Sequence, residues 1–146
     1  MIQDRVMSAI RDVADFPKPG IMFKDITPIM LDPKLSTDIV DHLAALYKDQ
    51  GIHKIAGIES RGFLFGYPVA MKLGIPFVLI RKAGKLPYHK LSYAYDLEYG
   101  SATIEIHVDA VKAGERVLIH DDLLATGGSA AAAAELIKKC GGEIAG

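Results

Sequence analysis

The chain has 146 residues, of which half are hydrophobic and 24% are charged, so it can bury a core and is not an extended disordered chain. Its 17 basic and 18 acidic residues give a net charge of −1, which excludes a bulk attraction to nucleic acid. A single cysteine, Cys140, excludes an internal disulfide and favours a reducing, cytosolic setting. No stretch approaches the roughly 18 apolar residues of a membrane span, so we expect no membrane association.

The first third of the chain is predicted to consist of short elements and loops. Isoleucine and valine at helical spacing predict a helix over residues 1–14. Two prolines stiffen residues 15–20, and the interrupted apolar segment 21–30 is interpreted as a loop with buried anchors or a short strand. A second helix is predicted over residues 36–50, with Ser36 as its cap.

From residue 54 onward, short apolar strands alternate with helices. The predicted strands are residues 54–58, 76–80, 102–108 (alternating and half-exposed) and 116–120, and the predicted helices are residues 62–73 and 129–140. The intervening residues 81–100 are predicted as a polar stretch. This order is typical of a parallel sheet with helices on its faces, whose ligands lie beyond the carboxyl ends of the strands. Residues 143–146 should enter another strand, so we expect the sequence to be truncated after Gly146.

The strongest motif follows the predicted strand 116–120. Two adjacent carboxylates, Asp121 and Asp122, can accept hydrogen bonds from the neighbouring hydroxyls of a ribose. The loop that leads into the next helix consists of Ala125, Thr126, Gly127, Gly128 and Ser129. Its glycines let the backbone approach a phosphate, and the N–H groups and dipole of the helix favour the same anion. The pattern therefore predicts a ribose 5-phosphate site, against the alternative of a strand, turn and helix with two solvated aspartates.

Other nucleotide-binding motifs are absent from the sequence. The loop lacks the Gly-Lys-Ser/Thr ending of a nucleoside triphosphatase, and no dinucleotide fingerprint occurs. His120 stands just before the two aspartates, and we interpret it as a buried histidine satisfied by a neighbouring group rather than as a catalytic residue.

The run from Val117 to Ser129 resembles the phosphoribosyl-pyrophosphate signature of the type I phosphoribosyltransferases. Four more segments resemble the adenine-specific branch of that family, in the order expected, and lie at residues 16–28, 59–66, 81–87 and 95–100. The resemblance implies an α/β fold, a Rossmann-like parallel sheet flanked by helices. It also implies a single phosphoribosyltransferase domain over residues 1–146, with a small N-terminal base-binding hood at 1–33 and an α/β core at 34–146.

The activity implied by the resemblance is purine salvage. A transferase of this kind converts adenine and 5-phosphoribosyl-1-pyrophosphate (PRPP) to AMP and pyrophosphate, with Mg²⁺ held mainly by the substrate and not directly by protein ligands. The resemblance also implies a cytoplasmic homodimer. Most of the catalysis would be positioning and electrostatic stabilisation of an oxocarbenium-like state.

The resemblance also implies a set of site residues. The ribose 5-phosphate would be bound by Asp121, Asp122 and the loop residues 125–129. Pyrophosphate would be bound by Ser60, Arg61, Arg81, Lys82 and Lys85. Arg81 is further implied to reach the site of a neighbouring subunit, and the Glu59–Ser60 peptide bond to be cis. For Lys82 and Lys85 the alternative is a solvated surface.

Glu98 is the implied catalytic residue, because a carboxylate near the base can accept or shuttle the proton that adenine loses from N9. Adenine is implied to bind through Met22, Phe23, Lys24 and Leu123, with the base packed between Met22 and Leu123. Backbone groups of Lys24 would distinguish a 6-amino group from a 6-oxo group. The alternatives are a surface role for Glu98 and a core role for Met22 and Phe23.

Two observations keep other interpretations open. Residues 88–90, Tyr88-His89-Lys90, depart from the glycine expected after Leu86-Pro87, so loop closure is in question. For Tyr93 and Tyr95 the two interpretations are packing over the site and exposure on the loop.

The competing functions are a type I phosphoribosyltransferase for another base, a non-catalytic module that senses PRPP or a nucleotide, and an inactive fragment whose sheet edge is open.

Overall fold

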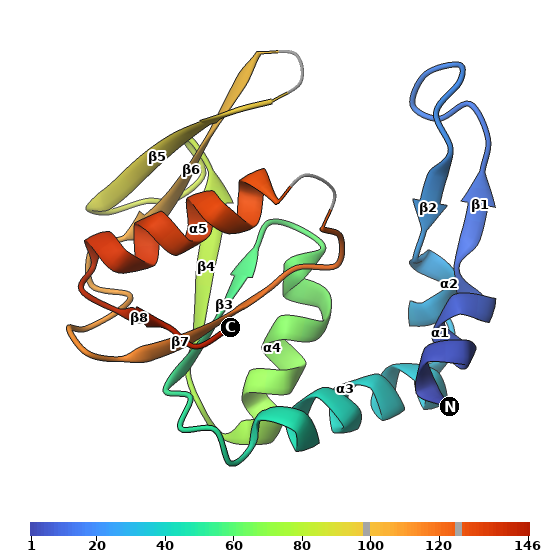
Figure 1. The fold of residues 1–146 in the computed structure, drawn as a ribbon, viewed down its shortest axis with the longest axis horizontal. Helices are drawn as coiled ribbons and strands as arrows, with labels where there is room; N and C mark the ends of the chain where they lie inside the picture. Colours follow the sequence, from blue (N-terminus) through green and yellow to red (C-terminus); the bar gives the residue numbers. More distant parts are fainter. Residues whose placement is uncertain (98–99, 125–126) are drawn as a thin grey trace. The chain divides into compact units, whose positions relative to one another are not determined.

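The computed structural model describes residues 1–97, 100–124 and 127–146, and these form two compact units, Met1–Leu43 and Ala44–Gly146 (Figure 1). The N-terminal unit contains α1 (Ile2–Ala9), β1 (Arg11–Val13), β2 (Phe23–Asp25), α2 (Thr27–Met30) and most of α3 (Pro33–Tyr47). The larger unit contains β3 (Lys54–Ile58), α4 (Gly62–Leu73), β4 (Phe77–Lys82), β5 (Lys90–Asp96), β6 (Ser101–His107), β7 (Arg116–His120), α5 (Gly128–Lys139) and β8 (Glu143–Ile144).

The N-terminal helix is shorter than predicted, because the chain turns into a hairpin after Ala9. Strands β1 and β2 pair in antiparallel fashion, with Arg11 opposite Asp25. The guanidinium of Arg11 lies 2.7 Å from the Asp25 carboxylate, and Lys24 forms an ion pair with Asp12 across the same ladder. Cross-strand charge pairs of this kind favour the hairpin over a continued helix. The segment 21–30 therefore holds a short strand, one of the two expected interpretations, but its last four residues form α2, which neither interpretation included.

Helix α3 begins at Pro33, three residues earlier than predicted, and Ser36 is not its cap. The carboxylate of Asp32 accepts a hydrogen bond from the Leu35 N–H at 3.0 Å, as an N-terminal capping residue does. Proline suits the first helical position because its missing N–H would have no partner there. The Ser36 hydroxyl instead donates to the Ile29 carbonyl oxygen at 2.8 Å, which ties α3 to α2.

The larger unit is built on a six-stranded sheet in the order β5-β6-β4-β3-β7-β8. Strands β4, β3, β7 and β8 are parallel, whereas β6 and β5 add to the β4 edge in antiparallel fashion. The predicted α/β fold is confirmed, and the structure adds the antiparallel hairpin. The predicted bounds of β3, α4 and β7 agree with the structure, and β8 confirms the strand expected after residue 142.

The β5–β6 hairpin was not fully predicted. Strand β5 lies within the stretch interpreted as polar, but its residues alternate, with Leu91, Tyr93 and Tyr95 packed against the core. The half-exposed character predicted for β6 is wrong, because Glu105 is only 5% exposed. Its carboxylate accepts hydrogen bonds from the Ser92 hydroxyl at 2.7 Å and from a backbone N–H at 2.8 Å, which satisfy it in the interior.

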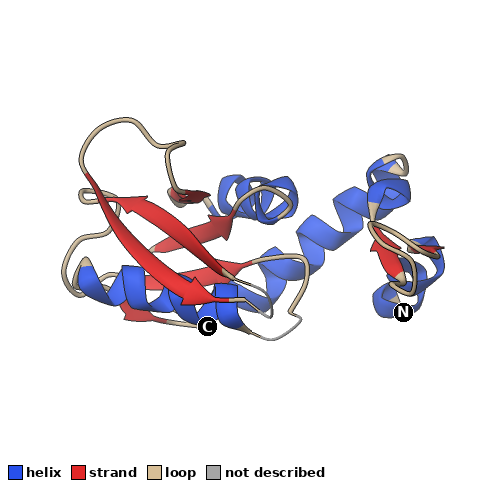
Figure 2. Cartoon of the chain, turned by 90° about the horizontal axis from the view of Figure 1, so that it is seen from above, coloured by secondary structure: helices blue, strands red, loops and turns tan. Residues whose placement is uncertain are grey.

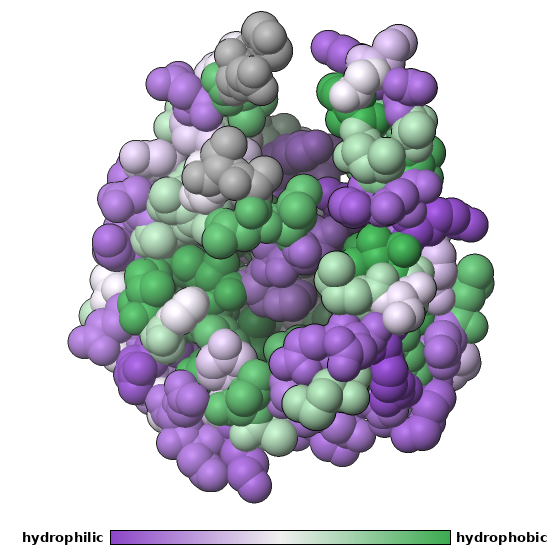
Figure 3. Space-filling model, turned by 45° about the vertical axis from the view of Figure 1, so that its right-hand side comes forward, coloured by the Kyte–Doolittle hydropathy of each residue, from purple (hydrophilic) through white to green (hydrophobic). Residues whose placement is uncertain are grey.

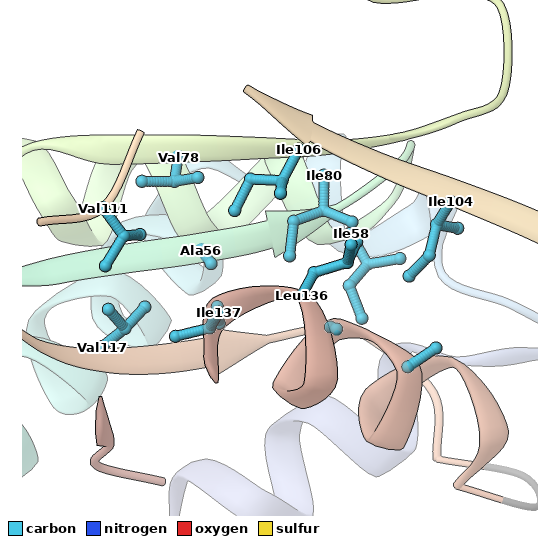
Figure 4. Close-up of a cluster of buried hydrophobic side chains, with 12 residues drawn as sticks. Ala56, Ile58, Val78, Ile80, Ile104, Ile106, Val111, Val117, Leu136 and Ile137 are labelled. Carbon is cyan, nitrogen blue, oxygen red and sulfur yellow. The ribbon is translucent and has the colours of Figure 1, made fainter. Parts of the chain in front are cut away.

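Helices cover both faces of this sheet. The face of α5 that carries Ala132, Ala133, Leu136 and Ile137 packs on the strands, and these residues join the hydrophobic core shown in Figure 4. In Figure 2, α5 lies beside the long β5–β6 hairpin. Residues on the opposite face of β3 contact α4, since side chains alternate between the faces of a strand.

The contact between α4 and the sheet is unusually close. A Cβ atom at Gly62 would lie 2.8 Å from the His120 carbonyl oxygen, and one at Gly66 would lie 2.8 Å from the Phe77 ring. Because glycine has no side chain, these two positions let the first turns of α4 lie directly against the end of β7 and the Phe77 ring of β4. This packing fixes where the loop before α4 lies.

The surface combines hydrophilic residues with smaller hydrophobic patches (Figure 3). Single exposed apolar residues are normal on folded proteins. Of the helices that the structure describes, none has the length and apolar character needed to cross a membrane.

Candidate active site

The candidate site lies at the carboxyl ends of β3, β4 and β7. These three strands are parallel neighbours, so the segments that follow them meet at one edge of the sheet. They line a cavity of about 810 Å³, whose walls include Glu59, Arg61, Lys82, Asp121, Asp122 and Ser129. The structure therefore brings together three of the segments that were singled out in the sequence.

Glu59 binds two cationic side chains, one at the end of β4 and one just after it. One of its carboxylate oxygens lies 3.0 Å from Arg81 Nε and accepts a hydrogen bond from the Lys82 backbone N–H at 3.1 Å. The other oxygen lies 2.9 Å from Lys85 Nζ. The side chain of Glu59 is 7% exposed, whereas those of Arg81 and Lys85 are 34% and 51% exposed. A buried carboxylate thus holds two partly exposed cations, Arg81 and Lys85, neither of which lines the cavity, whereas Glu59 and Lys82 do.

The charge on Glu59 is stabilised by these partners. Burial alone would raise its pKa, but hydrogen bonds from Lys85, from the Lys82 N–H and from Arg81 outweigh burial and lower the pKa to about 2. Sequence reasoning had assigned no role to Glu59. The only signal was a carboxylate placed directly before the Ser60-Arg61 pair, with more cations following the next strand.

The two aspartates differ in their surroundings. Asp122 forms an ion pair with Arg61, with 3.1 Å between Oδ2 and Nε. Asp121 accepts a hydrogen bond from the Asp122 backbone N–H at 2.8 Å. The pKa of the Asp121 carboxyl is raised to about 6, mainly by burial. The nearby Asp122 carboxylate also raises this pKa, whereas the Arg61 guanidinium lowers it. Asp121 is therefore ionised at neutral pH but becomes protonated in mild acid.

The start of α5 faces the same cavity. Gly127 precedes the helix with φ of 84°, a backbone conformation that favours glycine. Gly128 and Ser129 form its first turn and line the cavity, so backbone N–H groups at a helix N-terminus face the space beside the aspartates. The Ser129 hydroxyl lies 3.1 Å from the Tyr95 hydroxyl. Ala125 and Thr126 lie outside the described residues.

The loop between β3 and α4 has the backbone geometry that was predicted. The Glu59–Ser60 peptide bond is cis, and Ser60 is exposed immediately before Arg61. The close packing of Gly62 against the end of β7 brings this loop next to Asp121, because a Cβ on Gly62 would lie 3.4 Å from the Asp121 carboxylate.

His120 differs from its predicted state. It is largely buried, as predicted, but among the described residues its Nε2 atom has no hydrogen-bond partner, so no neighbour satisfies this atom. Burial lowers the pKa of the His120 imidazole, and the nearby Asp122 only partly opposes this effect. The ring packs against α4, with Cδ2 3.3 Å from the place of a Gly66 Cβ, so it fills space beneath the site.

The segment that departs from the family pattern is attached to β6. The Nε2 atom of His107 lies 2.6 Å from the Pro87 carbonyl oxygen, and Lys90 donates to the Leu86 carbonyl oxygen at 3.2 Å. Tyr88 adopts φ of 73° and places its ring against that of His107. These contacts hold residues 86–90 against the hairpin, downstream of Lys85.

The residues predicted to recognise the base belong to different units. Met22 is 54% exposed, and Phe23 packs edge-on against Phe16 within the N-terminal hairpin. Lys24 pairs with Asp12 through its side chain. Leu123 belongs to the larger unit, where it lines the cavity and is 56% exposed. Glu98, the predicted catalytic residue, lies outside the described residues.

Comparison with known proteins identifies the family. The phosphoribosyl transferase domain family matches residues 30–146. An adenine phosphoribosyltransferase from Streptomyces coelicolor is 53% identical over 145 residues, which cover 99% of this chain and 80% of the relative. This chain belongs to the adenine phosphoribosyltransferase family. A member from Escherichia coli O157:H7 is also 53% identical, over 94% of this chain and 75% of its own length.

Solved structures of the adenine phosphoribosyltransferase family agree with this assignment. The enzyme from Thermoanaerobacter pseudethanolicus matches with a TM-score of 0.93 and 49% identity, over 99% of this chain and 83% of that protein. The enzyme from Saccharomyces cerevisiae, complexed with an imino-altritol bisphosphate and adenine, matches with a TM-score of 0.92 and 42% identity, over 98% of this chain and 84% of that protein. The family resemblance inferred from the motifs is therefore confirmed.

Proposed function

We propose that this chain transfers the phosphoribosyl group of PRPP to adenine, which yields AMP and pyrophosphate. The observation that carries the proposal is the cavity in which Asp121 and Asp122, the N-terminus of α5 and the cations Arg61 and Lys82 meet. A ribose diol, a 5′-phosphate and a pyrophosphate have the hydrogen-bonding and charge requirements that these three groups supply. Membership of the adenine phosphoribosyltransferase family supports adenine as the base.

Within this cavity we assign the ribose hydroxyls to the two aspartates and the 5′-phosphate to residues 127–129. Ionised carboxylates are acceptors only, so they complement the hydroxyl donors of the ribose. The N–H groups at the start of α5 and its dipole complement the phosphate. Ala125 and Thr126 are proposed to belong to the same loop.

Pyrophosphate is proposed to bind beside Ser60, Arg61, Arg81, Lys82 and Lys85. As pyrophosphate departs, negative charge accumulates on its oxygens, and cations already held in place stabilise that charge without reorganisation. Glu59 keeps Arg81 and Lys85 in position, and Arg61 pairs with Asp122 at the wall of the cavity. The cations therefore act mainly by electrostatic stabilisation of the leaving group.

Mg²⁺ is proposed to enter with the substrate. Phosphate oxygens suit Mg²⁺, which proteins usually bind through substrate phosphates and only one or two carboxylates. Glu59, Asp121 and Asp122 are the carboxylates that line the cavity among the described residues. When bound, the ion would neutralise part of the pyrophosphate charge.

Glu98 is proposed as the acceptor for the N9 proton of adenine, and Met22, Phe23, Lys24 and Leu123 as the base-recognition residues. The N-terminal residues 1–33 are proposed to form the base-binding hood, with the remaining chain as the core. Glu98→Gln should lower turnover far more than it alters substrate binding. Unchanged turnover in that variant would remove Glu98 from the mechanism.

A cytoplasmic homodimer is the proposed state of the protein. Helix α4 exposes Leu64, Tyr67 and Met71, whose spacing places them along one side of the helix. Such an apolar stripe favours contact with a second copy. Arg81, near the end of β4, is proposed to contribute to the neighbouring site. Light scattering of wild-type protein and Tyr67→Glu tests the proposal, because the variant should be monomeric if this face is the interface.

A substrate panel tests the proposed reaction. Purified protein is mixed with PRPP and Mg²⁺, and adenine, hypoxanthine, guanine and xanthine are offered separately while nucleotide and pyrophosphate are followed. AMP from adenine alone is the expected result, and Asp121→Asn with Asp122→Asn provides the inactive control. Product from another base would overturn the assignment of the base. Binding of PRPP without product would favour a sensing module.

A further inference from the structure

The hydroxyl groups of Tyr95 and Ser129 form a contact that the assignments above leave unexplained. Their oxygens are 3.1 Å apart, although the two residues are 34 positions apart in the sequence. Tyr95 is the second-last residue of β5 and pairs with Ala102 of β6. Ser129 is the second residue of α5. Both side chains line the 810 Å³ cavity.

The Tyr95 hydroxyl is held firmly in place. The ring packs against the hydrophobic core of the larger unit, and the backbone is fixed by the antiparallel ladder with β6. The α5 helix packs against β5, so the distance between the two hydroxyls depends on rigid elements and not on a loop. A buried or partly buried hydroxyl in such a place is expected to have a definite hydrogen-bond role.

The direction of the hydrogen bond follows from what a phosphate needs. Phosphate oxygens that carry negative charge only accept, so a serine that contacts them must donate its single hydroxyl proton to them. The Ser129 oxygen then has free lone pairs, and Tyr95 can donate to one of them. A hydroxyl that accepts a hydrogen bond becomes a better donor, because such chains polarise one another.

We propose that Tyr95 is a positioning residue for the 5′-phosphate: its hydroxyl donates to Ser129 Oγ and so directs the Ser129 proton toward the phosphate oxygens. The order of donors is Tyr95 O–H to Ser129 Oγ, and Ser129 O–H to phosphate. This inference rests on the proposed function, which places the 5′-phosphate at the start of α5. It adds a residue from the β5–β6 hairpin to the recognition of that phosphate.

Tyr93 provides a matched comparison on the same strand. It lies two residues before Tyr95, so its side chain points to the same face, and it also packs against the core. Its ring lies under the Lys139 ammonium group, 5.1 Å from it, at the other end of α5 from Ser129. Tyr93→Phe therefore removes a hydroxyl from the same strand face without touching the proposed phosphate contact.

The experiment compares Tyr95→Phe, Tyr93→Phe, Ser129→Ala and the double variant Tyr95→Phe with Ser129→Ala. The KM values for PRPP and adenine, kcat, and inhibition by ribose 5-phosphate and by inorganic pyrophosphate are measured. For Tyr95→Phe, we expect the KM for PRPP and the inhibition constant of ribose 5-phosphate to rise roughly 2- to 10-fold, the effect of one neutral hydrogen bond. The KM for adenine and inhibition by pyrophosphate should stay within about 2-fold of wild type.

The double variant shows whether Tyr95 affects phosphate binding through Ser129. If Tyr95 acts through Ser129, the double variant should match Ser129→Ala alone, because there is no hydroxyl left to orient. Multiplied effects in the double variant would overturn the inference, as would a Tyr95→Phe variant that behaves like Tyr93→Phe. Thermal unfolding of both phenylalanine variants shows whether a change in KM comes from general destabilisation.

Failure of the inference and failure of the proposed function give different results. If Ser129→Ala leaves the KM for PRPP unchanged while AMP is still formed, Ser129 does not bind the phosphate. The proposed role of Tyr95 is then wrong as well, because it depends on Ser129. If Ser129→Ala raises that KM and Tyr95→Phe does not, only the role of Tyr95 is wrong. If wild-type protein forms no AMP at all, ribose 5-phosphate binding by the same four proteins still tests the hydrogen-bond chain.

Discussion

Replacing His120 with leucine tests whether the fold holds a neutral, unsatisfied histidine beneath the site. Leucine is apolar and of similar size, so the change removes the Nε2 atom that has no partner among the described residues while it keeps most of the packing against Gly66. An unsatisfied buried polar group costs about 1–3 kcal/mol, and imperfect repacking offsets up to about 1.5 kcal/mol of the gain. We therefore expect the variant to be about 1 kcal/mol more stable at pH 8.

Acidic pH should increase this difference in free energy of unfolding between His120→Leu and wild-type protein. Burial lowers the folded-state pKa of His120, so the unfolded chain binds the proton more tightly than the folded chain. The contribution of neutral His120 is complete above the unfolded pKa of about 6.5 and is lost as the pH falls below it. The advantage of the leucine variant in free energy of unfolding should therefore be larger at pH 5.5 than at pH 8.

Urea unfolding at pH 8 and pH 5.5 measures both values. The midpoints of wild-type protein and His120→Leu are compared at equal m-values, so that groups titrating in both proteins cancel. His42→Gln, a change on the exposed surface of α3, is the matched control and should follow the wild-type curve. A difference between wild type and His120→Leu that does not change with pH would refute the reasoning about burial.

Three further predictions concern the site. Glu59→Gln should lower the free energy of unfolding by about 1–2 kcal/mol in urea titrations, because glutamine cannot serve both cations that Glu59 holds; an unchanged midpoint would contradict its organising role. The kcat/KM for PRPP should fall below about pH 6 as Asp121 takes up a proton, and Asp121→Asn should show low activity without that acid limb. Gly62→Ala should destabilise the protein by about 1–3 kcal/mol by calorimetry, because its Cβ would lie 2.8 Å from a backbone oxygen; an unchanged unfolding temperature would contradict the close packing of α4.

The segments that could be predicted from the sequence are those with strong local signals. Strands β3 and β7 are short apolar runs, and α4 ends at Gly74, which adopts the left-handed conformation expected there. The phosphate loop was recognisable because its aspartates and glycines are contiguous. Elements with mixed patterns were missed or misplaced. Strand β5 alternates tyrosines with polar residues, and α3 takes its cap from Asp32 rather than from a serine.

The site itself shows the same division. The sequence alone determined which residues of the site bear charges and hydroxyls. It also determined that the segments after β3, β4 and β7 lie at one edge of the sheet, because strand periodicity and loop chemistry are local properties. Only the tertiary structure decided their partners: Glu59 meets Arg81 across 22 positions, and Tyr95 meets Ser129 across 34. It also decided that His120 is buried without a partner for Nε2 among the described residues. Such pairings depend on strand order, register and the depth at which α4 and α5 pack, which are set by contacts between distant segments and leave no local pattern in the chain.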